Sequence, residues 1–136
     1  MKTIIAYYSY SGHTKKLAVE LAAKESADIQ EIVEENRPDR LKAYTGGILD
    51  VMREKSWAIK PLPIAWNEYD QIILMSPVWA GNPPPPVRAF IDTLPSGKTV
   101  SVTMVAASGK AGCREKMEAL INGKGSSMKE FKVVKA

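Results

Sequence analysis

A turn rich in hydroxyl groups near the start of the chain carries the clearest signal for chemistry. An apolar, β-prone run from Ile4 to Tyr8 leads into this turn, which reads Ser-Tyr-Ser-Gly-His-Thr over residues 9–14. A helical pattern follows at once, with one face formed by Thr14, Leu17, Ala18, Leu21 and Ala22. The first N–H groups of a helix have no partner within it, and its dipole favours negative charge there. The turn therefore predicts an anion site.

The residue types in this turn suit a phosphate ester. Gly12 permits a positive φ and a close approach of the ligand, and Ser9, Ser11 and Thr14 add neutral hydroxyl donors. The turn is neither a dinucleotide fingerprint nor a Walker loop, because it contains no Gly-x-Gly-x-x-Gly and no Gly-Lys-Ser/Thr. An alternative is that Ser9 and Ser11 only shape the turn and cap the helix.

The pattern Ser-x-Ser-Gly-x-Thr after a first strand resembles the FMN-phosphate loop of the flavodoxin family. This resemblance implies that the phosphate is held by Ser9, Tyr10, Ser11, Gly12, His13 and Thr14. Two roles stay open for Tyr10, which either covers the ribityl chain or shields the turn. His13, the single histidine, either adds a donor near the phosphate or faces solvent.

A second segment has the form of a buried strand, a loop and a helix. The strand is expected over 71–76 and the loop over 77–82, and the helix begins in a run of four prolines, which suit a first helical turn. The segment resembles the flavodoxin loop of the type Ser-Pro-x-Trp-x-Gly. The resemblance implies that the flavin ring is flanked by Ser76, Pro77, Val78, Trp79, Ala80 and Gly81, with Trp79 as the stacking residue.

A third binding loop is expected after the fourth strand, over residues 107–113. By the same resemblance, the other side of the ring is flanked by Ser108, Gly109, Lys110 and Gly112, with Lys110 either beside the N1–C2 edge of the flavin or solvated. Electron-carrier flavodoxins have a Tyr here, but no aromatic residue lies between Val100 and Ala119. An open ring face suits the entry of a nicotinamide or a quinone. Cys113 is either a small buried residue or a thiol activated by a helix N-terminus.

Alternating strands and helices predict an α/β fold of three layers, with a parallel sheet covered on both faces. Strands are expected at 2–9, 28–33, 71–76, 99–107 and 129–134, and helices at 13–24, 40–55, 83–94 and 113–121. The resemblance implies a doubly wound, flavodoxin-like sheet of order 2-1-3-4-5. Residues 1–136 form one domain of a size that buries about two-thirds of its unfolded surface.

Only Lys135 and Ala136 follow the last expected strand, where flavodoxins have a closing helix. With this C-terminal helix absent, we expect an apolar strip on one sheet face, from residues 100–106 and 131–134, because one helix covers roughly two strands. Such a strip needs a cover. The cover is a second copy in a homodimer, a partner protein, or the first helix in an altered position.

Composition narrows the classes of function. The net charge of +4 lies entirely in residues 69–136, whereas electron-carrier flavodoxins are typically acidic. Interspersed acidic residues argue against a nucleic-acid partner, and one cysteine excludes an internal disulfide. No apolar run approaches the roughly 18 residues of a membrane span, and no signal peptide is evident. A cytoplasmic protein without a membrane partner is expected.

The residues show no paired carboxylates, Ser-His-Asp set or metal spacing, so we expect no catalytic side chain and no metal. The resemblance implies one noncovalently bound FMN, which serves electron transfer or a small flavin-dependent oxidoreductase. Its partner is then a redox protein or a small-molecule electron donor or acceptor. The alternative is a non-redox interaction module with the same fold and an empty or vestigial FMN site.

Overall fold

A five-stranded, all-parallel sheet forms the centre of the molecule. The computed structural model describes residues 2–37, 39 and 46–135. The strands are β1 (Thr3–Tyr7), β2 (Asp28–Glu31), β3 (Gln71–Pro77), β4 (Thr99–Ala106) and β5 (Ser127–Lys135), in the order β2-β1-β3-β4-β5. The predicted order and the predicted α/β class are confirmed.

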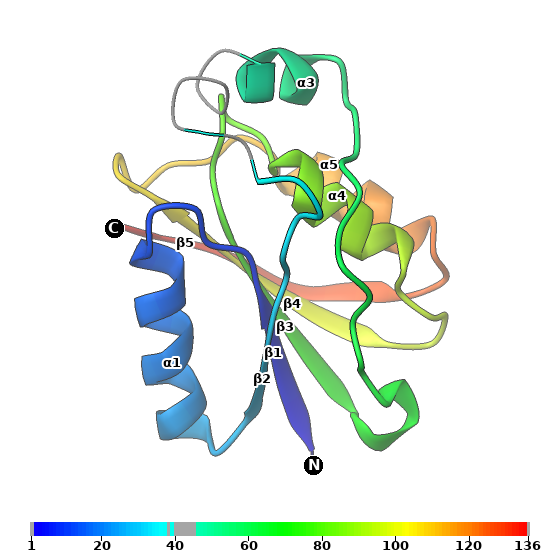
Figure 1. The fold of residues 1–136 in the computed structure, drawn as a ribbon. Coiled ribbons are helices and arrows are strands. Elements are labelled where there is room, and N and C mark those ends of the chain that lie inside the picture. The colour runs from blue at the N-terminus through cyan, green and yellow to red at the C-terminus, as the bar shows by residue number, and fades with distance from the viewer. Residues whose placement is uncertain (1, 38, 40–45, 136) are drawn as a thin grey trace.

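Helices lie on both faces of this sheet. They are α1 (His13–Glu25), α3 (Ile48–Met52), α4 (Pro85–Asp92) and α5 (Arg114–Asn122), with a short 3₁₀ helix, η2 (Trp66–Glu68). Figure 1 shows α1 on one face of the sheet and α4 with α5 on the other. The small helix α3 lies beyond the edge where the strands end, beside the loop that connects β3 to α4. No helix among the described residues is long and apolar enough to cross a membrane.

The alternation of side chains along each strand divides the core into two parts. Ile5 and Tyr7 of β1 pack against α1, whereas Ile4 and Ala6 belong to the larger core beneath α4 and α5. Both sets are buried because helices cover both faces of the sheet. The strands are thereby fixed in register, and their carboxyl ends meet at one edge.

The proline run starts α4 as the sequence predicts. Pro84 occupies the N-cap with φ −65°, and Pro85 opens the first turn, where a missing N–H costs nothing. Val87, Phe90, Ile91 and Leu94 then point into the main core. This helix fixes the far end of the β3–α4 loop.

The helix expected over 40–55 is described only in part. Its described portion is α3, which ends at Met52 and leads into a turn where Glu54 has a φ of +57°. Residues 40–45 of that prediction lie outside the described residues. Glycines at 46 and 47 precede α3.

The apolar strip predicted from residues 100–106 and 131–134 is not formed. The strongly apolar side chains of these segments face the core under α4 and α5, namely Val100, Val102, Met104, Phe131 and Val133. The opposite face carries Ser101 and Thr103 beside Glu130 and Lys132, followed by Val105 and Val134. The prediction counted whole strands, whereas alternate residues point to opposite faces. In addition, α1 contacts three strands, β1, β2 and β3, instead of two.

Candidate functional site at the carboxyl edge of the sheet

The three loops predicted to bind the cofactor follow three neighbouring strands. β1 and β3 are paired with Tyr7 opposite Met75, and β3 and β4 are paired with Ser76 opposite Met104. Parallel strands in register end at the same edge, so the loops after β1, β3 and β4 meet there. The gap between β1 and β3 in chain order is the switch point at which open α/β sheets bind ligands.

The turn over residues 9–14 has the geometry of an anion site. Gly12 is the N-cap of α1 with a φ of +103°, and its N–H donates to Ser9 Oγ at 3.0 Å. A glycine cap brings no side chain to the N–H groups of the first helical turn, and no acidic residue lies in that turn. Ser11, Gly12 and His13 are exposed. These N–H groups can therefore receive an external acceptor.

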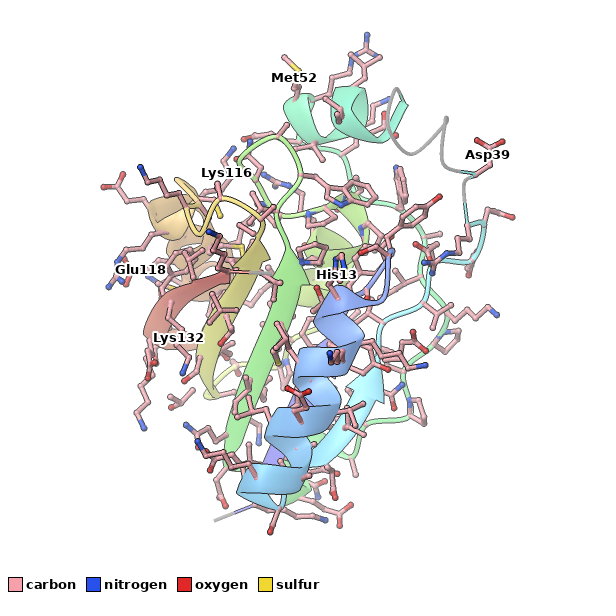
Figure 2. The ribbon with its side chains drawn as sticks, turned by 90° about the vertical axis from the view of Figure 1, so that its left-hand side faces the viewer. His13, Asp39, Met52, Lys116, Glu118 and Lys132 are labelled. Carbon is pink, nitrogen blue, oxygen red and sulfur yellow. The ribbon has the colours of Figure 1, made fainter. Side chains whose placement is uncertain are left out.

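Ser9 and Thr14 are buried beneath this turn, while His13 is on the surface. Ser9 and Thr14 are 6% and 2% exposed, so their side chains shape the floor of the site. Figure 2 shows His13 at the start of α1. Its Nδ1 lies 3.2 Å from Ser11 Oγ. The structure thus places His13 in a solvent-facing position that also borders the turn.

The β3–α4 loop contains a tight two-residue turn. Trp79 and Asn82 exchange backbone hydrogen bonds of 2.9 and 3.0 Å, and Ala80 and Gly81 between them both have positive φ, +50° and +79°. Positive φ at both central positions is the signature of a type I′ turn. Ser76 is fully buried and donates to the carbonyl of Pro77 at 2.8 Å. Ala80 and Gly81 are exposed at the tip of the loop.

Trp79 is the centre of an aromatic cluster. Its ring makes edge-on contacts with Tyr8, Tyr10 and Trp57, at centroid separations of 6.0, 6.1 and 5.8 Å. The contact with Tyr10 joins the β3–α4 loop to the turn over residues 9–14, which we name the phosphate turn after its predicted ligand. Trp57, which follows α3, also reaches this cluster and donates Nε1–H to Asp50 at 2.8 Å. Trp66 packs on Phe90 of α4.

A pocket of about 340 Å³ borders the same cluster. Its described lining residues are Asn36, Ser56, Trp57 and Ala58. None of these four belongs to the three predicted loops. Among these described lining residues, Trp57 alone belongs to the aromatic cluster.

The loop after β4 is largely exposed and, apart from Lys110, is built from small residues. Gly109 has a φ of +74°, and Lys110 N–H donates to Ser108 Oγ at 3.2 Å. Ser108, Lys110 and Gly112 are exposed. Cys113, which ends the loop, is 1% exposed, and burial raises the pKa of its thiol. Cys113 is thus the small core residue of the two alternatives, because a raised pKa opposes thiolate formation.

Two residues that the sequence motifs did not include support the phosphate turn from below. Glu34 is 2% exposed and accepts a hydrogen bond of 2.5 Å from the hydroxyl of Tyr8. Arg37 Nη1 donates to Glu34 at 3.0 Å, and its Nη2 donates to the carbonyls of Ser9 and Tyr10 at 3.2 and 2.7 Å. The guanidinium also lies 4.6 Å from the centroid of the Tyr10 ring.

The Glu34–Arg37 pair fixes the turn without adding net charge to it. Arg37 occupies two turn carbonyls, and the carboxylate of Glu34 compensates its charge. Burial, followed by the hydrogen bond to Glu34, raises the pKa of Tyr8 far above its usual value, so Tyr8 remains a donor. No sequence motif marks Glu34 and Arg37 as part of the site. They could have been found only from the strand order, because both residues follow β2 and β2 is the neighbour of β1.

Comparison with known proteins agrees with this architecture. A family model described as Flavodoxin matches residues 2–135, so the chain belongs to the flavodoxin family. We found no curated protein that matches the chain. Among solved structures, the flavoprotein from Lactobacillus acidophilus NCFM in complex with FMN is 24% identical, with a TM-score of 0.82 over 97% of this chain and 92% of that chain.

Two further structures share the fold at lower identity. A protein from Bacteroides eggerthii DSM 20697 is 21% identical, with a TM-score of 0.84 over 98% of this chain and 87% of that chain. The flavodoxin from Streptococcus pneumoniae TIGR4 is 16% identical, with a TM-score of 0.58 over 100% of this chain and 87% of that chain. At these identities the similarity establishes the fold, and the binding properties have to be argued from this chain's own residues.

Proposed function

We propose that the chain binds one FMN noncovalently at the carboxyl edge of β1, β3 and β4 and serves as a flavin-dependent redox protein. The observation that carries the proposal is the turn over residues 9–14. It combines a glycine N-cap of positive φ, an exposed stretch over residues 11–13 and neutral hydroxyls at the start of a 13-residue helix. Membership of the flavodoxin family and the FMN complex of the Lactobacillus acidophilus protein support it.

The residues present fit the phosphate of FMN. A methyl group placed on the Cα of Gly12 would meet no atom within 4 Å, so the space above the turn is open to a ligand. The turn contains no Lys or Arg, and its donors are N–H groups and hydroxyls, which suit a terminal monoester. Arg37, below the turn, is already paired with Glu34 and with turn carbonyls.

The role of the protein is to hold and orient the cofactor, and bound FMN supplies the electron-transfer chemistry. Residues 9–14 would bind the phosphate, and residues 76–81 and 108–112 would flank the ring. Trp79 is held in place by three aromatic neighbours, which suits a rigid wall for the ring. Lys110 is exposed beside the same edge and can add positive charge near the ring.

Between electron carrier and oxidoreductase, we favour the oxidoreductase. The loop after β4 carries no aromatic side chain to cover the ring, and its residues Ser108, Lys110 and Gly112 are exposed. A small-molecule donor or acceptor can then approach that side. The alternative, an interaction module with a vestigial site, is disfavoured because the glycine cap, the hydroxyls and the supporting Arg37 are all in place.

The test is a pair of fluorescence-quenching titrations with FMN and riboflavin. Charge-assisted bonds to the phosphate contribute about 1.5–3 kcal/mol each, so FMN should bind at least about tenfold more tightly than riboflavin. Equal affinity for the two ligands would contradict the phosphate assignment. Absence of binding to either would favour the interaction module. Steady-state transfer of two electrons from a reduced nicotinamide, which is oxidised, to a quinone, which becomes a hydroquinone, then separates oxidoreductase from carrier.

Two glycine variants show whether the turn itself is responsible. Gly12→Ala places a side chain at a φ of +103°, and Gly97→Ala does the same at +78° in the distant turn before β4. Each should cost about 1–2 kcal/mol of stability from backbone strain. We expect only Gly12→Ala to weaken FMN binding, by about tenfold or more. A similar loss in Gly97→Ala would mean that general destabilisation explains the effect.

A further inference from the structure

A charged cluster outside the three loops joins α3, α4 and α5. Glu54, in the turn after α3, lies 3.6 Å from Arg88 Nη2 and 3.0 Å from Lys116 Nζ. Arg88 is in α4 and Lys116 in α5. Two cations thus face a single carboxylate, and the cluster retains one positive charge.

Arg88 is buried with part of its hydrogen-bonding capacity unused. The residue is 8% exposed, and within the described part of the chain its Nε and Nη2 have no hydrogen-bond partner. The contact with Glu54 at 3.6 Å is an ion pair but too long for a hydrogen bond. Buried donors are almost always satisfied, so a buried guanidinium with two free N–H groups calls for a missing acceptor.

The two unpaired nitrogens define the shape of that acceptor. Nε and Nη2 form one side of the guanidinium fork, which binds two oxygens of a single carboxylate or phosphate in parallel. Lys116 adds a second cation, which pairs with the same Glu54 carboxylate as Arg88. The Lys116 side chain is about one-third exposed. Solvent therefore reaches the cluster from the Lys116 side, which Figure 2 shows near the loops at the sheet edge.

The cluster is connected to the predicted flavin loop. Lys116 Nζ donates to the side-chain carbonyl of Asn82 at 3.0 Å. Asn82 closes the tight turn that contains Ala80 and Gly81, and its own amide donates to the carbonyl of Ala80 at 3.1 Å. An anion bound by the two cations would consequently lie next to the loop that flanks the ring.

We propose that Arg88 and Lys116 form a second oxyanion site, which binds a carboxylate or phosphate group of the small molecule that exchanges electrons with the flavin. The site itself rests on the cluster, and its role as a substrate site rests on the proposed FMN function. Glu54 occupies the entrance in the absence of the anion. Its side chain is 58% exposed, and the hydrogen bond from Lys116, with the charge of Arg88, lowers the pKa of its carboxyl.

Displacement of Glu54 by the ligand gives the site its distinguishing property. The incoming oxyanion replaces the carboxylate beside Arg88 and pairs with Nε and Nη2. Removal of the competing charge should tighten anion binding, whereas a purely structural ion-pair cluster would only lose stability. Glu54→Gln separates these two roles, because glutamine keeps the size of the side chain and removes its charge.

The experiment is a titration of the ¹⁵N-labelled, FMN-loaded protein, followed by the Arg88 Nε–H and Asn82 side-chain amide signals. The probes are inorganic phosphate and acetate, at constant ionic strength. With FMN bound, the phosphate turn is filled. We expect saturable shifts of both signals, about fivefold tighter binding in Glu54→Gln, and at least about fivefold weaker binding in Lys116→Gln. Lys132→Gln, which removes a charge on β5, should leave the affinity within about twofold.

The probe that saturates the signals at the lower concentration, phosphate or acetate, shows whether the site prefers a phosphate or a carboxylate group. Unshifted signals with both probes would overturn the site, as would equal weakening in Lys116→Gln and Lys132→Gln, which would indicate a general charge effect. The failure of FMN to bind would contradict the proposed function alone. In that case the titration is run on the free chain, where amides of Gly12 and His13 report phosphate at the turn and Arg88 reports it at the second site.

Discussion

At the scale of single residues, the phosphate turn depends on a buried carboxylate below it. Glu34 is almost fully buried, and its two oxygens are taken by Tyr8 and Arg37. Buried carboxylates are retained only when they are paired and hydrogen-bonded. Arg37 connects Glu34 to the turn, because its Nη2 donates hydrogen bonds to the carbonyls of Ser9 and Tyr10.

Arg37→Met should therefore act on both stability and binding. It leaves Glu34 with only one donor and releases two turn carbonyls. Arg37 is partly exposed, so we expect a loss of about 1–3 kcal/mol, below that for a fully buried pair, together with weaker FMN binding. Urea unfolding and flavin titration measure the two effects.

The double variant Glu34→Gln/Arg37→Met provides the control for this prediction. Without the carboxylate, the loss of Arg37 no longer leaves a buried charge unpaired, so stability should recover in part. FMN affinity should stay reduced, because the carbonyls of Ser9 and Tyr10 are still released. Full additivity of the two single changes would contradict the coupling.

Tyr8 makes stability sensitive to alkaline pH. Its pKa is raised far above the ordinary value of 10.0, mainly by burial and then by the hydrogen bond to Glu34. Tyr8 therefore contributes its full share to the free energy of unfolding below pH 10. That share is lost as the pH rises, because Tyr8 ionises in the unfolded chain and stays protonated in the folded chain. Stability should fall by up to about 1.4 kcal/mol per pH unit above that point.

Unfolding curves of Tyr8→Phe and Tyr69→Phe at a series of alkaline pH values test this expectation. Phenylalanine at position 8 should flatten the alkaline decline. Tyr69, whose pKa is raised to about 12 mainly by its hydrogen bond to Asp28, lies at the surface, where solvent screens the effect. Its variant should change the slope less. An unchanged slope in Tyr8→Phe would refute the assignment.

At the scale of elements, the chain's local signals predicted most of the fold. Apolar strands, the helical face after Thr14 and the proline start of α4 all formed where periodicity placed them, because local preference and tertiary packing agree there. The strand order came from the resemblance to flavodoxins. The turn over residues 9–14 was recognisable as a candidate phosphate site because phosphate binding at a helix start needs a fixed order of glycine and hydroxyl residues.

Other features of the site had no local signal. Arg37 and Glu34 reach the turn across the β1–β2 pair, and Arg88 meets Lys116 and Glu54 from three different helices or turns. Such contacts depend on the packing of segments far apart in the sequence. The contact of Trp57 with Trp79 is of the same kind, since it requires α3 to lie over the β3–α4 loop.

Gly47, which precedes α3, lies close to Trp79 of this loop, so a substitution at Gly47 should affect the position of Trp79. A methyl group at Gly47 would lie 3.1 Å from the ring of Trp79, whereas one at Gly46 would meet nothing within 4 Å. Gly47→Ala should therefore displace Trp79, with a change in near-UV circular dichroism and weaker flavin binding. Gly46→Ala is the matched control and should leave both unchanged. Equal spectra for the two variants would show that α3 does not constrain Trp79.

At the scale of the whole molecule, the two faces of the sheet differ in chemistry over β4 and β5. The face toward α4 and α5 is continuous apolar core. The face toward α1 presents Ser101, Glu130 and Lys132, and the last two form an ion pair of 3.5 Å. Burial of such a polar surface against another protein gains little and requires new partners for its charges.

This polarity bears on the homodimer predicted from the sequence. The dimer was expected to bury an apolar strip, and only Val105 and Val134 remain as apolar members of that face of β4 and β5. Val105 is itself 4% exposed within one chain. We therefore expect a monomer at low micromolar concentration, measured by light scattering coupled to size exclusion, with little binding of the dye ANS.

Lys132→Leu with Glu130→Val tests the physical reason for this expectation. The double substitution adds two apolar side chains beside Val134 on the same face, and an exposed apolar patch promotes association. We expect the variant to bind ANS and to self-associate while the wild-type chain remains a monomer. A wild-type dimer that the substitutions leave unchanged would show that association uses another surface. A wild-type dimer disrupted by Glu130→Lys would establish the β4–β5 face as a polar interface and contradict the expected monomer.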